Sequence, residues 1–144
     1  MDEKYAHLRL GNQLCFPLYA CAKEIVRRYK PLLDPLDLTY TQYIAMMVLW
    51  EKKELTVKEL GDCLWLDSGT LTPVLKKLES KGYLTRRRSD SDERSVVLSL
   101  TSEGLALQDR AAAIPAQAGG CIRLDAEEAG QLYALLYKVL DGLR

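Results

Sequence analysis

Apolar residues recur at helical spacing along most of the chain, and this pattern predicts five or six helices with one small β-hairpin. A first helix is expected from Leu14 to Tyr29. Pro31 and Pro35, which follow it, then break the helical pattern. The segment from Thr39 to Trp50 is apolar nearly all round, which indicates a buried helix. The last helix, from Ala126 to Leu143, carries its leucines and a valine on one side.

Two short helices are predicted in the middle of the chain. Thr56 and Glu59 have the spacing of a capping box, and the helix that they open ends near Leu64. The next helix runs from about Ser68 to Ser80. Gly82 closes it, because glycine readily adopts the left-handed conformation found beyond helix ends.

A hairpin follows these two helices. Residues Tyr83 to Arg88 and Ser95 to Leu100 are expected to be strands, joined by the polar turn SDSDER. Thr101 then opens a further helix, which Pro115 interrupts. The order helix, helix, strand, charged turn, strand is that of a winged helix-turn-helix. The predicted fold is therefore mainly α with a small β-hairpin wing, and residues 39–101 form its DNA-binding part.

Composition supports one ordinary globular domain. The chain has 144 residues, 48% hydrophobic and 28% charged, and its formal net charge is zero. Residues 68–88 nevertheless carry six basic side chains and one acidic side chain, a local stripe typical of a phosphate-binding surface. No apolar run reaches the roughly 18 residues that span a membrane, and the N-terminus lacks signal-peptide features. We expect a cytoplasmic protein with no membrane partner.

The cysteines do not form a metal or disulfide pattern. They occur at positions 15, 21, 63 and 121, without a CxxC motif and with a single histidine, His7, which we expect to be incidental. We therefore expect no metal and no cofactor. Cys63 is predicted to be a core residue, and Cys21 is poorly placed to pair with Cys15 within one helix.

The helix from Ser68 to Ser80 is the candidate recognition helix. Hydroxyl groups near its N-terminus can reach phosphates or base edges, and threonine methyls can meet thymine methyls. Two lysines one turn further along are placed near the DNA backbone. The candidate DNA-binding residues on this helix are Ser68, Thr70, Thr72, Lys76 and Lys77.

The turn of the hairpin is the candidate wing. Arg94 is expected to enter the minor groove, where narrow A·T tracts attract a guanidinium, and Asp92 is expected to position it. Arg86, Arg87 and Arg88 alternate in direction along their strand, so they cannot all face DNA together. We retain Arg86 as a candidate contact. A solvated charged hairpin that touches nothing is the alternative.

The two ends of the chain are more apolar than flanking helices need to be. Such a surplus is typical of a subunit interface, and DNA-binding proteins of this kind are commonly two-fold dimers on palindromic sites. We predict a homodimer formed by residues 1–35 and 102–144, bound to a palindromic double-stranded operator.

At this point a family resemblance becomes visible. The stretch DSGTLTPVLKKLESKGYLTRRRSDSDERSVVLSLT closely resembles the MarR family of transcriptional regulators. The segments LCFPLYA, YKPLL and LTYTQY resemble its organic-hydroperoxide-sensing branch, the OhrR repressors. The resemblance covers residues 10–115. It implies a single MarR-type domain over residues 1–144 and a dimeric repressor that releases its operator on oxidation.

The resemblance also implies residue roles. The cysteine of the LCF motif, Cys15, corresponds to the peroxide sensor, and Tyr19 and Tyr29 match tyrosines that line the sensor pocket. Tyr40 is a plausible third tyrosine. The wing aspartate and arginine of the family match the pair already singled out in the turn.

Part of this chemistry can be argued from the residues. A thiol reacts with peroxide as the thiolate, so the site must stabilise an anion. Tyr19 lies one helical turn after Cys15, and Tyr29 could donate a hydrogen bond from the partner subunit or along the same face. Pro17 is tolerated only if the helix starts near Phe16 or kinks there, and either case leaves unpaired backbone amides beside the thiol.

The fate of the oxidised sulfur stays open. A sulfenate on Cys15 can be trapped by a small thiol or by a second protein cysteine. Cys121 is the candidate resolving cysteine, since Gly119 and Gly120 beside it would allow local movement. The sequence does not decide between these routes, nor between release and activation on oxidation.

Two other functions remain open. A MarR-type repressor released by a small phenolic or carboxylate ligand could use the tyrosines and Trp50 as a pocket. A thiol peroxidase would need a cation beside the nucleophile, and no such arginine–threonine constellation surrounds Cys15 in the sequence. A repressor released by a ligand would still bind DNA through the basic wing, whereas the wing would have no purpose in a peroxidase.

Overall fold

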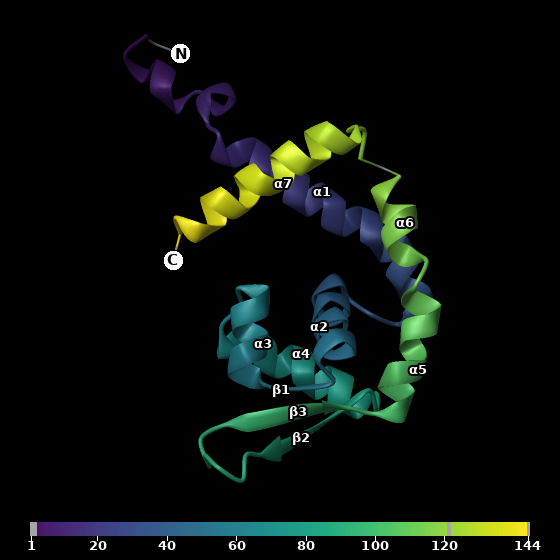
Figure 1. Ribbon diagram of the computed structural model, residues 1–144. Coiled ribbons are helices and arrows are strands. Elements are labelled where there is room, and N and C mark those ends of the chain that lie inside the picture. Colours follow the sequence, from purple (N-terminus) through teal and green to yellow (C-terminus); the bar gives the residue numbers. More distant parts are fainter. Residues whose placement is uncertain (1–2, 121, 144) are drawn as a thin grey trace. The chain divides into compact units, whose positions relative to one another are not determined.

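The structure, a computed structural model, describes residues 3–120 and 122–143. Its contacts group the chain into two compact units, residues 1–114 and 115–144. Figure 1 shows the elements along the chain. In chain order they are η1 (Glu3–Leu8), η2 (Leu10–Asn12), α1 (Cys15–Leu33), η3 (Asp34–Leu36), α2 (Tyr40–Lys52), β1 (Glu54–Thr56), α3 (Val57–Leu64), α4 (Ser68–Ser80), β2 (Leu84–Arg88), β3 (Val96–Leu100), α5 (Ser102–Ala111), α6 (Ile114–Gly119) and α7 (Ala126–Asp141).

Helix α1 continues through the first of the two prolines that were expected to end it. Pro31 lies inside α1, and the helix reaches Leu33. A proline removes one backbone hydrogen bond, here that of the Arg27 carbonyl, and Arg27 is exposed so water can replace the lost donor. The second proline, Pro35, does stop the helix: the chain tightens into η3, and Asp37 then adopts a left-handed conformation with φ 53°.

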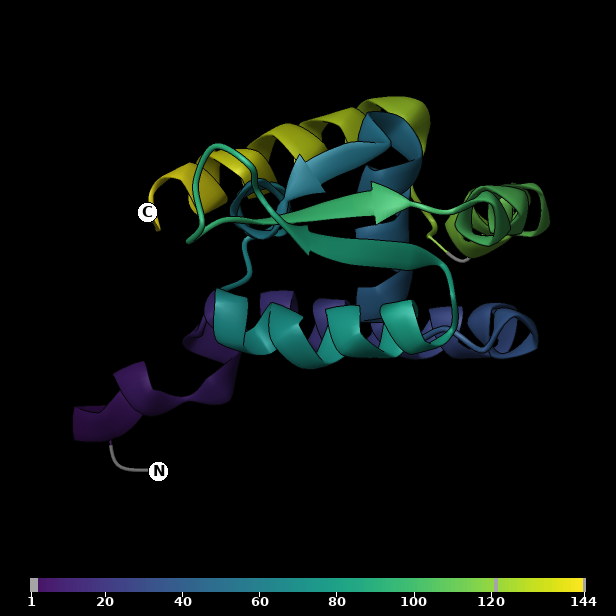
Figure 2. The ribbon, with the colours of Figure 1, turned by 90° about the horizontal axis from the view of Figure 1, so that it is seen from below.

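The sheet has one strand more than the predicted hairpin. Its order is β1-β3-β2, with all neighbours antiparallel, and Figure 2 shows β3 between the other two strands. Strand β1 has three residues, too few for the alternation of apolar and polar residues that reveals a strand in sequence. It pairs Leu55 with Leu98 and thereby attaches the α2–α3 connection to the wing.

The core of the first unit lies among α2, α3, α4 and the sheet. The expectation of a buried helix at residues 39–50 is confirmed, since α2 buries Met46, Leu49 and Trp50. The indole N–H of Trp50 donates a hydrogen bond of 2.8 Å to the Gly104 carbonyl, which ties α2 to α5. Further core leucines come from the two helices of the helix-turn-helix and from the sheet: Leu60, Leu71, Leu75, Leu78, Leu84 and Leu98.

The predicted helix starts in this part of the chain are confirmed. The Thr56 hydroxyl accepts from the Glu59 amide at 3.1 Å, and the Glu59 carboxylate accepts from the Thr56 amide at 2.7 Å, which is a complete capping box. Gly82 has φ 78° and follows α4 as predicted. The region therefore folds as a winged helix-turn-helix with α4 as its second helix.

The second unit consists of the end of α6 and of α7. Asp125 and Glu128 form a capping box that was not singled out in the sequence, and it starts α7 at Ala126 as expected. Large apolar side chains of α7 are exposed, among them Leu132 and Leu135. In the described ranges no helix has the length and apolarity needed to cross a membrane.

Candidate functional site

The N-terminus of α4 is held by its own cap. Asp67 Oδ1 accepts a hydrogen bond of 2.8 Å from the Thr70 amide, and this bond is the main reason why the pKa of Asp67 is lowered. Leucines at positions 71, 75 and 78 bury the inner face of the helix. The opposite face, with Ser68, Thr72 and Lys76, is exposed. The exposed face therefore combines hydroxyl groups, a cation and the positive end of the helix dipole.

The hydroxyls of the two exposed threonines of α4 already donate hydrogen bonds to the N-terminal part of the helix and its cap. Thr70 Oγ1 donates to Asp67 at 3.2 Å, and Thr72 Oγ1 donates to the Ser68 carbonyl at 2.7 Å. Toward a ligand these hydroxyls can act as acceptors and can present their methyl groups. Phosphate oxygens need donors, so the threonines are better suited to base edges than to the backbone.

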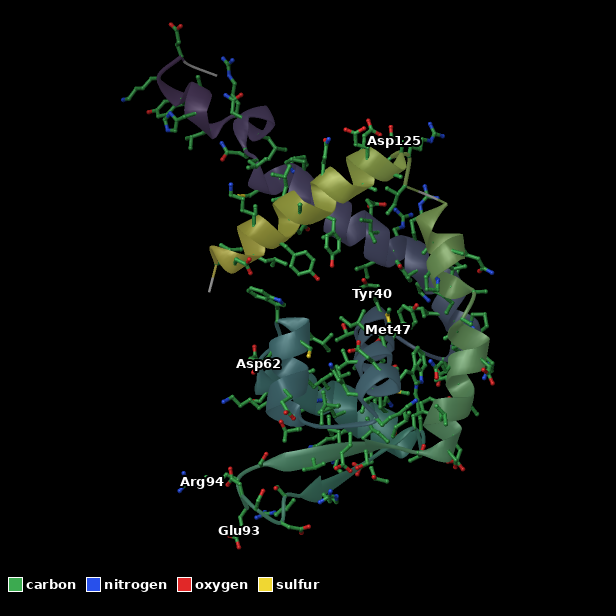
Figure 3. All side chains as sticks on the ribbon, viewed as in Figure 1. Tyr40, Met47, Asp62, Glu93, Arg94 and Asp125 are labelled. Carbon is green, nitrogen blue, oxygen red and sulfur yellow. The ribbon has the colours of Figure 1, made fainter. Side chains whose placement is uncertain are left out.

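The wing has the local geometry predicted for its turn. Figure 3 shows Arg94 and Glu93 at the tip of the hairpin. The Arg94 amide donates to Asp92 Oδ1 at 3.0 Å, and the Ser95 amide donates to the Asp92 carbonyl at 2.9 Å. Asp92 therefore fixes the turn through two acceptors and sets the direction in which Arg94 leaves the backbone.

The three consecutive arginines do alternate, and the alternation changes the role of one of them. Arg86 is half-buried and holds the Glu79 carboxylate through Nε at 2.8 Å and Nη2 at 2.7 Å. Arg87 points to the other side, where it meets Glu54 at 3.3 Å. The direct DNA contact predicted for Arg86 stays a prediction, because in this structure Glu79 binds two of its guanidinium nitrogens. Through this ion pair Arg86 braces β2 against α4.

A groove of about 610 Å³ connects α3, α4 and the wing. It brings together five of the eight predicted DNA-binding residues, namely Ser68, Thr72, Arg86, Asp92 and Arg94. Thr70, Lys76 and Lys77 lie outside its lining and are exposed on α4.

One residue of the groove lining, Lys58 of α3, was not predicted from the sequence. Its position one residue before the capping glutamate could have indicated that its side chain is exposed near the start of α3.

The thiol at the start of α1 is accessible. Cys15 is the first residue of α1 and is exposed, and Tyr19 one turn later is 64% exposed. The Phe16 amide already donates to the Gln13 carbonyl at 3.3 Å, and Pro17 has no N–H. The helix start near Phe16 is confirmed, but it offers a thiolate fewer unpaired amides than the sequence suggested.

Two of the predicted pocket tyrosines meet at the other end of α1. The rings of Tyr29 and Tyr40 are 4.9 Å apart between centroids, and Tyr43 lies 5.9 Å from Tyr29. Burial, and next the neighbouring Tyr29, raises the pKa of Tyr40 and of Tyr43. Their hydroxyls therefore stay protonated at neutral pH and can donate hydrogen bonds. Tyr43 was missed because it lies on a helix that reads as core throughout.

A single chain does not bring Cys15 to this tyrosine cluster. Cys15 and Tyr29 are separated by fourteen residues of one helix, which corresponds to about 21 Å along its axis at ~1.5 Å per residue. A hydrogen bond from Tyr29 along the same face of the same helix is therefore excluded. Within the chain, Tyr19 is the tyrosine one turn from the thiol.

The other cysteines divide into three cases. The prediction that Cys63 is a core residue was wrong: it is exposed, because Leu60, Gly61 and Leu64 occupy the inner face of α3. Cys21 is also exposed on α1. Cys121 lies outside the described residues. Among residues 3–120 and 122–143, no group of three or more His, Cys, Asp or Glu side chains could hold a metal ion.

A smaller pocket of about 260 Å³ lies beside the tyrosine cluster. Tyr40, Val26 and Leu33 supply apolar walls, and the lining also holds Arg27 and the ion pair of Lys30 with Asp34. A small organic molecule with an apolar body suits such a lining.

The winged helix, its grooved reading face and its exposed α4 together define a transcriptional regulator. Residues 27–110 match the family model described as transcriptional regulator SarA/Rot. The organic hydroperoxide resistance transcriptional regulator of Bacillus subtilis is 50% identical over 143 residues, covering 99% of this chain and 97% of that protein. The chain belongs to the MarR family of transcriptional regulators, in the branch of the OhrR repressors.

Solved structures agree with this assignment. Reduced AbfR bound to DNA has a TM-score of 0.79 and 34% identity, and covers 98% of both chains. Overoxidized AbfR bound to DNA scores 0.78 with 33% identity. AbfR is a protein of Staphylococcus epidermidis. The reduced form of MarR from E. coli scores 0.71 at 30% identity, over 89% of this chain and 96% of that one.

Proposed function

We propose that this regulator is a repressor that senses organic hydroperoxides through Cys15 and then releases a palindromic DNA operator. The observation that carries the proposal is the presence in one chain of an exposed thiol at the start of α1 and a grooved winged-helix face. The name of the B. subtilis relative supports the choice of oxidant. Because the operator lies with the chromosome, we keep the cytoplasm as the proposed location.

The chemical step is a two-electron oxidation of sulfur. The Cys15 thiolate attacks the distal oxygen of the hydroperoxide, the O–O bond breaks and an S–O bond forms. The alkoxide leaves, takes a proton and becomes an alcohol, while Cys15 becomes a sulfenic acid. The peroxide is therefore the oxidant that is reduced. The sulfenate can then be trapped by a small thiol or by Cys121, a position outside the described residues.

We infer that the complete sensor site needs two subunits. Tyr19 can approach the thiol from the same helix, but the cluster with Tyr29 lies about 21 Å along α1. In an antiparallel arrangement of two α1 helices, the start of one helix meets the far end of the other. Exposed apolar residues on α1, such as Phe16 and Ile25, provide a face for this pairing. The Tyr29 that serves Cys15 then comes from the partner.

A complementation experiment tests this arrangement. Cys15→Ser and Tyr29→Phe proteins should each be oxidised poorly, the first because it lacks the thiol and the second because it lacks the tyrosine hydroxyl. If the site is shared, a heterodimer of the two variants contains one complete site, so a sulfenate-reactive probe labels about half as many subunits as in wild type. If the site lies within one chain, the heterodimer stays as unreactive as the two parents. Heterodimers purified through two different affinity tags would supply the sample.

Release by a small ligand is the second candidate, and the 260 Å³ pocket beside the tyrosine cluster favours it. Its discriminating variant is Cys15→Ser, because a regulator that responds to a ligand alone keeps its response without the thiol. A thiol peroxidase is distinguished by turnover. With a thiol reductant present, we expect a sensor to consume about one peroxide per subunit and then stop, whereas sustained consumption under the same conditions would identify an enzyme.

A further inference from the structure

The linker between α1 and α2, residues 34–39, is bound by cationic side chains of α1, of α5 and of the C-terminal cap of α4. Lys30 of α1 binds the Asp34 carboxylate at 2.9 Å. Arg110 of α5 donates to the Pro35 carbonyl at 2.6 Å. Lys81, at the C-terminal cap of α4, binds Asp37. The linker is thus the place where α1, α4 and α5 are joined by polar contacts.

The contact of Lys81 differs from the other two by its burial. The Lys81 side chain is 18% exposed, whereas that of Asp37 is 89% exposed. Lys81 Nζ donates to the Asp37 backbone carbonyl, lies 3.0 Å from Asp37 Oδ2 and lies 3.5 Å from Gln42 Oε1. Gln42 belongs to the capping box at the start of α2. One ammonium group therefore binds both the linker and the N-terminus of α2.

The linker is also anchored by apolar side chains, so it cannot move as a loose tether. Leu33, Leu36 and Leu38 are buried in the core at 1%, 6% and 5% exposure. A left-handed residue at Asp37 turns the chain between the last two leucines. A displacement of the end of α1 must therefore displace the neighbouring core and the groups bound to the linker.

We propose that Lys81 is a positioning residue for operator recognition, through which the linker sets the orientation of α4. This inference rests on the proposed function, because it assigns a route from the oxidised sensor to the DNA-reading face. Lys81 follows the C-terminal end of a 13-residue helix, and the reading face is at the other end. The helix is about 20 Å long, so a small rotation at Lys81 displaces Ser68 and Thr72 across the groove.

The test compares four variants with wild type. Lys81→Met removes the ammonium but keeps an unbranched chain that fills the same space. Lys81→Arg keeps a cation. Asp37→Asn removes only the exposed charge, since asparagine tolerates the left-handed conformation and the carbonyl remains. Lys52→Met is the matched control, because Lys52 is also paired, with Glu51 at 2.9 Å, but does not contact the linker.

Two quantities are measured on each purified dimer. The first is the ratio of operator Kd after and before one equivalent of cumene hydroperoxide, by fluorescence anisotropy with DNA from upstream of the protein's own gene. The second is sulfenate labelling of Cys15, which reports whether the sensor itself still reacts. A melting curve establishes that each variant is folded.

For Lys81→Met we expect the Kd ratio to shrink at least about threefold, with Cys15 labelling unchanged. Lys81→Arg should recover part of the ratio, and Asp37→Asn should change it less than twofold, because its charge is largely solvated. Lys52→Met should match wild type. A wild-type ratio in a folded Lys81→Met protein overturns the role of Lys81 and leaves the proposed function intact. If oxidation leaves operator affinity unchanged in wild type, the proposed function fails, and the role of Lys81 fails with it.

Discussion

Arg94 is positioned by a carboxylate two residues earlier in the chain. Asp92 accepts the Arg94 amide at 3.0 Å and holds the turn, so the guanidinium leaves the wing from a fixed point. The sequence could predict this pair because both residues lie in one short turn. The sequence could not predict that Arg86 would pair with Glu79, seven residues earlier, since this contact depends on how β2 packs against α4.

Replacing Arg94 with alanine should weaken operator binding without altering the sensor. The loss of a minor-groove guanidinium is expected to cost about 1–3 kcal/mol, or roughly 5- to 150-fold in Kd. Anisotropy titrations at one salt concentration would measure it, with Lys52→Met as the control. Full operator affinity in the alanine variant would remove the wing from the interface.

The cap of the recognition helix should make its stability depend on pH. The hydrogen bond from the Thr70 amide, with smaller contributions, lowers the pKa of Asp67 below its ordinary value of 3.8. A carboxylate with a lowered pKa stabilises the fold above the unfolded pKa, and this stabilisation is lost as pH falls through the folded pKa. Asparagine is also a good cap but does not titrate.

Melting temperatures of wild type and Asp67→Asn between pH 7 and pH 3 would therefore converge. The wild type should melt higher at pH 7, and the difference should begin to shrink near pH 4 and go on shrinking toward pH 3. Asp109→Asn, an exposed site elsewhere on the surface, serves as the control. A constant difference across the whole pH range would contradict the role of the charge.

At the scale of elements, the helices that have a capping box or a long apolar segment were predicted correctly, whereas the short strand β1 and the end of α1 were not. Thr56 with Glu59 and the apolar segment before Trp50 each combine a local cap or periodicity with core burial, and both predictions are confirmed. Strand β1 could not be seen, because its three residues gain their structure from pairing with β3. The prediction that the helix ends before Pro31 was wrong, because a proline near an exposed helix end destabilises the helix little.

The junction of α5 with the wing should tolerate no side chain at Gly104. A methyl group there would collide with the backbone carbonyl of Tyr83 and with a methyl of Leu100. Gly104→Ala is expected to cost about 1–3 kcal/mol of unfolding free energy, as overpacked sites do. Gly119→Ala is the control, since a methyl at that position has nothing within 4 Å. Urea denaturation of both variants would measure their unfolding free energies. Equal values would mean that the backbone around Gly104 shifts at little cost to accommodate the methyl group.

At the scale of the whole molecule, the proposed sensor and the DNA-binding face could each be predicted from the sequence, but the contacts between them could not. The sequence singled out Cys15, Tyr19 and Tyr29 as candidate sensor residues, and only the structure shows that Cys15 and Tyr29 lie toward opposite ends of one helix. The same holds for Lys81, whose partner Asp37 is 44 residues away. Long-range contacts of this kind leave no periodic signal in the chain.

The proposed dimer makes a prediction at this scale. Leu132 and Leu135 are exposed on α7, at 43% and 59%. Glutamate at both positions should prevent dimer formation, because carboxylates would have to be buried without partners. Sedimentation equilibrium should then give the monomer mass, and operator affinity should fall with the loss of the second half-site. A stable dimer of the double variant would place the interface elsewhere.

The central claim is that oxidation of Cys15 controls DNA binding. It is tested most directly by operator titrations of wild type and Cys15→Ser, each reduced and after one equivalent of cumene hydroperoxide. We predict tight binding by both reduced proteins, release of the wild type on oxidation and no release of the variant. Equal release of both proteins would contradict the claim and assign the response to another group.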